Sequence, residues 1–227
     1  MEKIKKALAE KGKYWIVFVG DSITSTEWVH PNWREIVGYV LNDKVNGDWG
    51  LRCFNFGYDG STTKDILAKM DDILSIRPDL IVLMIGGNDG VLNVSIDEHK
   101  NNIQRIISMA AEKEIEIIFS TDNNPWNTIS SNIYLPYVEE DRKMGINGFI
   151  DMYKESENFP SEKIYTFITE MDIPEDNMKK GDLDFWHPNQ LGNAYIAKTF
   201  LRNIWRIEFN PEKYIEETLR GEKLPKY

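Results

Sequence analysis

The chain has 227 residues, and at about 150 residues per domain this length favours one domain over two. Hydrophobic residues make up 41% and charged residues 28% of the chain, so it can form a sizeable core, and a disordered chain is excluded. Asp and Glu outnumber Lys and Arg by 37 to 27, and the resulting net charge of −10 argues against nucleic acids and anionic membranes as partners.

The cysteine count and the first residues bear on cellular location. Cys53 is the only cysteine, so an intrachain disulfide is impossible, and with three histidines a Cys/His zinc site is not expected. Residues 1–11 lack the apolar centre of a signal peptide, and no apolar run is long enough to cross a membrane. The sequence as given predicts a cytoplasmic protein without membrane insertion; a signal peptide removed beforehand would leave no trace.

Five continuous apolar runs predict strands that are buried on both faces of a parallel sheet. Cys53, inside the second run, is expected to be a small buried residue. The runs are Tyr14–Val19, Leu51–Phe56, Leu80–Ile85, Ile115–Phe119 and Ile164–Ile168.

Amphipathic helical patterns lie between the predicted strands. One follows Thr62, which forms a capping pair with Asp65, and another follows Ser95, the first residue of an S-x-x-E capping box. A last helix is predicted from about Asn189 to Trp205. Alternation of strands and helices predicts right-handed βαβ crossovers in a three-layer α/β/α sandwich.

Two stretches depart from this alternation. Residues 121–161 are interpreted as an insertion that includes a helix near 137–156, and not as a domain boundary. The tail, residues 206–227, is charged and is expected to form a peripheral C-terminal arm. We therefore expect residues 1–227 to form a single domain with its core at about 14–205.

Residues with catalytic potential follow the predicted strands, at the edge where open parallel sheets bind their ligands. Ser22 follows the first strand, and Asp184 and His187 precede the last helix. A serine becomes a nucleophile when a histidine removes its proton and a carboxylate orients that histidine. Ser22, His187 and Asp184 fit these roles, with Asp182 as a weaker alternative for the carboxylate.

Acyl transfer also requires hydrogen-bond donors that point toward the developing oxyanion. The backbone N–H groups of Ser22 and Gly57 and the side-chain amide of Asn88 are candidates, because Gly57 and Asn88 follow the second and third strands.

Four segments resemble, in order, the four sequence blocks of the SGNH (GDSL-type) hydrolase family, and they span residues 20–188. They are Gly20-Asp21-Ser22-Ile23, Asn55–Gly60, Gly86-Gly87-Asn88-Asp89 and Asp184–His187. The resemblance implies the SGNH hydrolase fold, a flavodoxin-like five-stranded parallel sheet of order 2-1-3-4-5, and no metal or other cofactor. It also implies a triad of Ser22, Asp184 and His187, and an oxyanion hole formed by Ser22, Gly57 and Asn88.

Further residues beside these blocks are candidates for a substrate pocket: Asp21, Trp28, Asp89, Trp126 and Trp186. For each tryptophan, packing in the core or in a loop is the alternative, since aromatic residues serve both purposes. His99, inside a capped helix, and the acidic cluster Glu139–Asp141 are expected to face solvent.

The sequence thus predicts a serine esterase that hydrolyses short-chain acyl esters through an acyl-enzyme, with O-acetylated carbohydrate preferred over lysophospholipid as substrate. An O-acyltransferase with the same acyl-enzyme and a lysophospholipase- or thioesterase-like acyl hydrolase are alternatives. A non-catalytic flavodoxin-like binding module is a remote one. The predicted partner is a small-molecule acyl ester, and no residue pattern indicates an oligomeric state.

Overall fold

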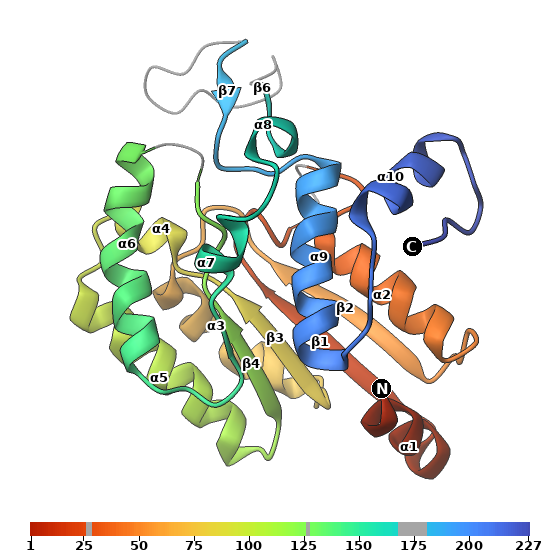
Figure 1. Ribbon diagram of the computed structural model, residues 1–227. Coiled ribbons are helices and arrows are strands. Elements are labelled where there is room, and N and C mark those ends of the chain that lie inside the picture. Colours follow the sequence, from red (N-terminus) through yellow and green to blue (C-terminus); the bar gives the residue numbers. More distant parts are fainter. Residues whose placement is uncertain (26–28, 126–127, 168–180) are drawn as a thin grey trace.

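The main sheet of the protein is parallel and has five strands. The computed structural model describes residues 1–25, 29–125, 128–167 and 181–227. The strands lie in the order β2-β1-β3-β4-β5, which confirms the predicted order 2-1-3-4-5 (Figure 1). They are β1 (Tyr14–Gly20), β2 (Leu51–Gly57), β3 (Leu80–Met84), β4 (Glu116–Ser120) and β5 (Phe149–Ile150).

Helices cover both faces of this sheet, as the continuous apolar runs predict. Along β1, Ile16 and Phe18 point to one helical layer, whereas Val17 and Val19 point to the other. The first layer contains α2 (Trp33–Lys44) and α9 (Gln190–Trp205), and the second contains α3 (Thr63–Ser75) and α5 (Ile96–Glu112). The predicted three-layer sandwich is therefore confirmed.

Three of these helices begin at the predicted capping residues. Thr62 and Asp65 form a complete capping box at the start of α3. Ser95 Oγ accepts the N–H of Glu98 at 3.1 Å, and Asn189 caps α9. Local sequence therefore sets the positions at which α3, α5 and α9 begin.

The strand β2 differs from the prediction because it lies at the edge of the sheet. Arg52, Cys53 and Asn55 are exposed, so the second apolar run is not buried on both faces. The expectation of a buried Cys53 is wrong, since β2 is the edge strand of the sheet that the described residues form.

The prediction of a fifth strand at Ile164–Ile168 is also wrong. Ile164 ends a helix, residues 166–167 join a separate antiparallel ribbon, and Ile168 lies outside the described residues. The fifth strand of the main sheet is β5, whose two residues are too few to produce a recognisable apolar run. The predicted insertion at 121–161 thus contains the last sheet strand.

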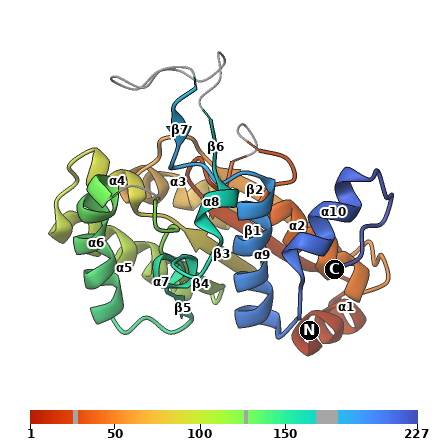
Figure 2. The same cartoon turned by 45° about the horizontal axis from the view of Figure 1, so that its top comes forward.

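Short elements around β5 complete the carboxyl end of the sheet. Figure 2 shows the ribbon of β6 and β7 above this end, next to α8. The elements are α4 (Gly87–Val91), α6 (Thr128–Lys143), α7 (Met152–Ser156), α8 (Ser161–Ile164), β6 (Thr166–Phe167) and β7 (Leu183–Asp184).

The two ends of the chain add helices outside the alternating core. The helix α1 (Glu2–Lys11) precedes β1, and α10 (Pro211–Leu219) packs on α9. Phe209 and Tyr214 of the C-terminal tail are buried in the same apolar cluster as α2 and α9. In the described residues, no helix is both long and apolar enough to cross a membrane.

Candidate active site

Ser22 lies in the turn that follows β1. The carboxylate of Asp21 accepts the N–H of Ile23 at 3.0 Å, and the Asp21 backbone carbonyl accepts the N–H groups of Thr24 and Ser25 at 3.1 and 2.9 Å. These bonds turn the chain sharply after the strand and leave Ser22 half-buried at the carboxyl end of the sheet.

Three side chains predicted from distant segments meet at this turn. His187 Nε2 lies 2.9 Å from Ser22 Oγ, and His187 Nδ1 lies 2.9 Å from Asp184 Oδ2. Asp182, the alternative carboxylate, is exposed. In this geometry the imidazole can accept the hydroxyl proton on Nε2, while the carboxylate accepts the hydrogen of Nδ1 and so keeps the ring oriented.

Asp184 is fixed both by β7 and by the residues that follow it. Its Oδ1 accepts the backbone N–H groups of Trp186 and His187, each at 3.0 Å, so that one carboxylate oxygen is used by the turn and the other by the imidazole. Burial raises the pKa of Asp184. The side-chain hydrogen bond and the charge of His187, together with the bonds from the backbone N–H groups of His187 and Trp186, lower it by more, so the pKa lies below its ordinary value. Asp184 is therefore ionised at neutral pH.

Gly57 lies against the serine turn so closely that no side chain fits there. A Cβ at this position would be 2.4 Å from the nitrogen of Ser25, and the φ of Gly57 is not positive, so space and not backbone freedom requires the glycine. Its N–H donates to the side-chain Oδ1 of Asn55 at 2.9 Å. The predicted oxyanion donor thus has an internal acceptor, which the sequence analysis did not identify.

Asn88 is half-buried on the one-turn helix α4, near the serine turn. Its side-chain amide donates to the backbone carbonyl of Ser61 at 3.0 Å and lies 3.5 Å from Asp21 Oδ2. The bond to Ser61 fixes the plane of the amide. The structure therefore places Asn88 next to Asp21, which immediately precedes Ser22.

Asp21, predicted as a pocket residue, is buried and hydrogen-bonds with Asp122. Burial and the charge of Asp122 raise the pKa of Asp21 well above its ordinary value, and burial raises the pKa of Asp122 to about 7. Asp122 Oδ2 also accepts the N–H of Gly87 at 2.6 Å. Because two adjacent buried carboxylates repel each other, the pair holds a proton. Asp122 was missed, although it follows β4 as the other site segments follow their strands.

Asp89, also predicted to line the pocket, points into the protein interior and is fully buried. It is bonded to His99, which in turn contacts Asp141. The expectation that His99 and Asp141 face solvent is wrong, because α4, α5 and α6 enclose these side chains where they pack together. Of the acidic cluster, Glu139 is exposed as predicted.

The tryptophans proposed for the pocket are described only in part. Trp28 and Trp126 lie outside the described residues. Trp186 is half-buried beside His187, and its ring centroid is 5.9 Å from that of Phe185. Of these three tryptophans, Trp186 is therefore the one that the described residues place beside the triad.

A groove of about 880 Å³ lies at the opposite, amino end of the strands. It is lined by residues such as Lys3, Tyr14, Asp79 and Glu116, and its charged side chains pair with one another, as Lys3 does with Glu116. In the part of the chain that is described, no group of three His, Cys, Asp or Glu side chains is arranged to hold a metal. The side chains suited to nucleophilic catalysis are therefore those around Ser22, and not those of the groove.

The sequence matches one protein family over most of its length. The profile of the GDSL-like lipase/acylhydrolase family covers residues 18–195, which include all the site segments named above. No curated protein sequence matches the chain.

Solved structures of esterases share the fold at low sequence identity. An acetylxylan esterase from Geobacillus stearothermophilus is 19% identical, with a TM-score of 0.64 and coverage of 87% of this chain and 95% of that one. The acetyl xylan esterase AlAXEase is 20% identical, with a TM-score of 0.60 and coverage of 84% and 99%. A lipase/acylhydrolase from Enterococcus faecalis is 21% identical, with a TM-score of 0.61 and coverage of 84% and 95%.

Proposed function

Given that the chain belongs to the GDSL-like lipase/acylhydrolase family and is a carboxylic ester hydrolase, we propose that it cleaves short-chain acyl esters with Ser22, His187 and Asp184 as its catalytic triad. The observation that carries this proposal is the continuous hydrogen-bonded row from Ser22 Oγ through both ring nitrogens of His187 to Asp184 Oδ2, each contact being 2.9 Å.

The geometry supports a two-step acyl transfer. Ser22 Oγ attacks the ester carbonyl carbon while His187 Nε2 takes the hydroxyl proton, and the imidazolium then gives that proton to the departing alcohol. A water molecule, deprotonated by the same nitrogen, then attacks the acyl carbon; the bond from that carbon to Ser22 Oγ breaks, Oγ takes the proton back from the imidazolium, and the acid is released. Asp184 stays ionised in both steps and stabilises the imidazolium, which agrees with its lowered pKa.

In this proposal, three donors hold the negative oxygen of the tetrahedral intermediates: the N–H groups of Ser22 and Gly57 and the amide of Asn88. The Asn88 amide has two hydrogens: one is donated to the Ser61 carbonyl at 3.0 Å, and the other makes only a long contact of 3.5 Å with Asp21 Oδ2, which a substrate oxyanion can replace. The Gly57 N–H becomes available when the Asn55 side chain turns away from it.

Acetyl groups on carbohydrate are the substrates we favour. Two of the structures with the same fold are acetylxylan esterases, and Trp186, beside the triad, offers an aromatic face to a sugar ring. Structures of the Geobacillus stearothermophilus enzyme include catalytic mutants in which a serine, an aspartate or a histidine is replaced by alanine. There the aspartate precedes the histidine by three positions, as Asp184 precedes His187.

The test is hydrolysis of p-nitrophenyl esters with acyl chains from C2 to C12, followed by acetylated xylooligosaccharides and a lysophospholipid as competing natural-type substrates. We expect the highest kcat/KM at C2–C4 and release of acetate from the oligosaccharides. An optimum at C8 or longer would contradict the short-chain proposal, and acetyl transfer to an added sugar in preference to water would indicate an acyltransferase.

Asn55→Ala is expected to raise kcat on p-nitrophenyl acetate about two- to tenfold. The bond between Asn55 Oδ1 and the Gly57 N–H must break before that N–H binds the oxyanion, and a net hydrogen bond of this kind is worth about 0.5–1.5 kcal/mol. Asn42→Ala, on α2, is the matched control and leaves kcat unchanged. A lower kcat in Asn55→Ala would mean that the side chain supports the loop and does not compete with substrate.

A further inference from the structure

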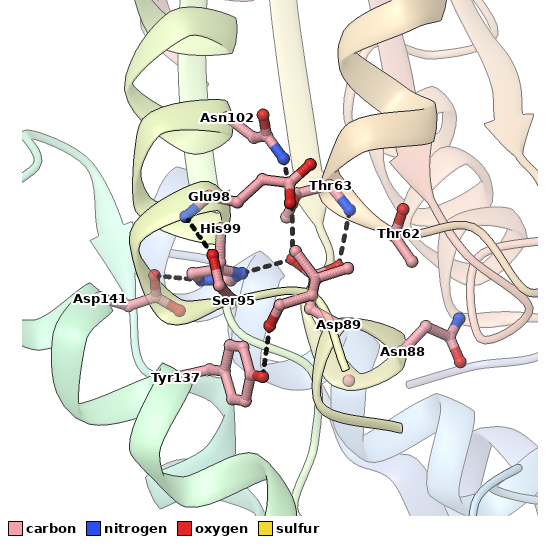
Figure 3. A network of polar contacts seen from close by, with 12 residues as sticks. Thr62, Thr63, Asn88, Asp89, Ser95, Glu98, His99, Asn102, Tyr137 and Asp141 are labelled. Atoms are coloured by element: carbon pink, nitrogen blue, oxygen red, sulfur yellow. Dashed lines mark hydrogen bonds and ion pairs between the residues drawn. The ribbon is translucent and has the colours of Figure 1, made fainter. Parts of the chain in front are cut away.

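A buried polar network lies behind the helix that carries Asn88. The carboxylate of Asp89 accepts the N–H of Thr63 at 2.8 Å and its hydroxyl at 2.5 Å, and lies 2.7 Å from His99 Nδ1 (Figure 3). His99 Nε2 lies 2.9 Å from Asp141 Oδ1. His99, Asp89 and Asp141 are completely shielded from water, and they link α4, α5 and α6 to the start of α3.

The contacts of His99 identify its charge. Both ring nitrogens face carboxylate oxygens, which are acceptors when ionised, so both nitrogens carry hydrogens and the ring is an imidazolium. Burial lowers the pKa of His99, but the hydrogen bonds and charges of Asp141 and Asp89 outweigh this and raise the pKa to about 9. A cation between two carboxylates is thus held in place by charge-assisted bonds.

This network ends one residue from the predicted oxyanion donor. Asn88 and Asp89 are neighbours on α4, and in Figure 3 the side chain of Asn88 points away from the network. A single helical turn is not stable alone, so its position depends on bonds from its surroundings. Gly86, at its start, also packs against His99: a Cβ there would lie 3.3 Å from His99 Cε1.

We propose that His99 is a positioning residue of the active site, which fixes Asp89, and through it the short helix α4, so that the neighbouring Asn88 amide is held in line with the oxyanion. This inference rests on the proposed function, because it concerns the oxyanion hole of that site. His99 touches no substrate atom. Its effect reaches the reaction only through Asn88.

The first test compares His99→Gln with Ile106→Val, a change that removes one methylene from the same helix in the apolar core. We expect His99→Gln to lower kcat on p-nitrophenyl acetate about 10- to 30-fold with KM changed less than threefold, since the oxyanion exists only in the transition state. Ile106→Val lowers the unfolding temperature but leaves kcat unchanged. If His99→Gln is folded and keeps the wild-type kcat, the proposal is wrong.

A double-mutant cycle with Asn88→Ala then identifies the route of the effect. If His99 acts through Asn88, the double variant loses no more activity than Asn88→Ala alone, which is expected to lose about 10²–10³-fold. Losses that multiply would overturn the positioning role. If Asn88→Ala itself retains full activity, it is the proposed oxyanion hole that fails, and the two failures are thereby distinguished.

The pH profile supplies a readout that a merely structural residue would not move. Deprotonation of His99 removes one of its two donors, so kcat of the wild type falls as pH rises through about 9, and this decrease is absent in His99→Gln. Asp141→Asn removes one carboxylate charge and moves the decrease to lower pH. An unchanged alkaline limb in both variants would refute the proposal. Among the described residues, the titratable groups that face His99 or act on its partners are Asp89, Asp122, Tyr134, Tyr137, Asp141 and Asp151.

Discussion

Ser22→Ala is expected to lower kcat for p-nitrophenyl acetate by about 10⁴–10⁶-fold, because the covalent route through the acyl-enzyme is then closed. The Oγ of Ser22 is the atom that His187 Nε2 contacts at 2.9 Å, and an alanine methyl group offers neither a nucleophile nor a proton. The turn itself should fold normally, since its bonds come from the backbone and from Asp21. The measurement is steady-state hydrolysis over C2–C12 esters, corrected for spontaneous hydrolysis.

Covalent labelling locates the nucleophile independently of the rate. A serine-directed organophosphonate should add one adduct mass to the wild-type chain, at Ser22, and none to Ser22→Ala. Ser25→Ala is the matched control, because Ser25 is the other serine of the same turn and donates its hydroxyl hydrogen to the Ser22 carbonyl at 3.2 Å. This variant should keep the adduct. An adduct that persists in Ser22→Ala and disappears in Ser25→Ala would move the nucleophile to Ser25.

Asp184→Asn should lower kcat by about 10⁴-fold, as the equivalent change does in serine proteases with a Ser-His-Asp triad. The asparagine can keep the turn, because its Oδ1 still accepts the N–H groups of Trp186 and His187. Its NH₂ group, facing His187 Nδ1, favours the tautomer that has the hydrogen on Nε2, and that tautomer cannot accept the proton of Ser22. The loss therefore appears in kcat, with little change in the unfolding temperature.

Asp182→Asn is the control for that experiment. It makes the same chemical change two positions away, at an exposed residue, and is expected to leave kcat within about twofold of the wild type. Equal losses in Asp182→Asn and Asp184→Asn would refute the assignment of the orienting carboxylate.

Short-range signals were enough to predict most elements of the sheet and the starts of its helices. The runs at β1 and β3 are apolar without interruption because both faces of these strands are covered, and Thr62, Ser95 and Asn189 cap their helices through bonds to residues at most three positions away. The same local patterns failed at β5 and at residues 164–168. A two-residue strand is identified only by its pairing with β4, which sequence periodicity does not report.

The sequence by itself determined the family, the fold and the identity of the groups proposed for catalysis, because these depend on residue types in short blocks at the ends of strands. Only the tertiary structure decided which polar side chains meet. His99 looked like a solvent-facing residue on a capped helix, yet the packing of α4, α5 and α6 places it between Asp89 and Asp141, which lie 10 positions before it and 42 positions after it in the chain. The pairing of Asp21 with Asp122 arises in the same way, from the packing of segments that are far apart in the sequence. Burial by distant segments sets the charge and direction of such groups, and no local pattern encodes it.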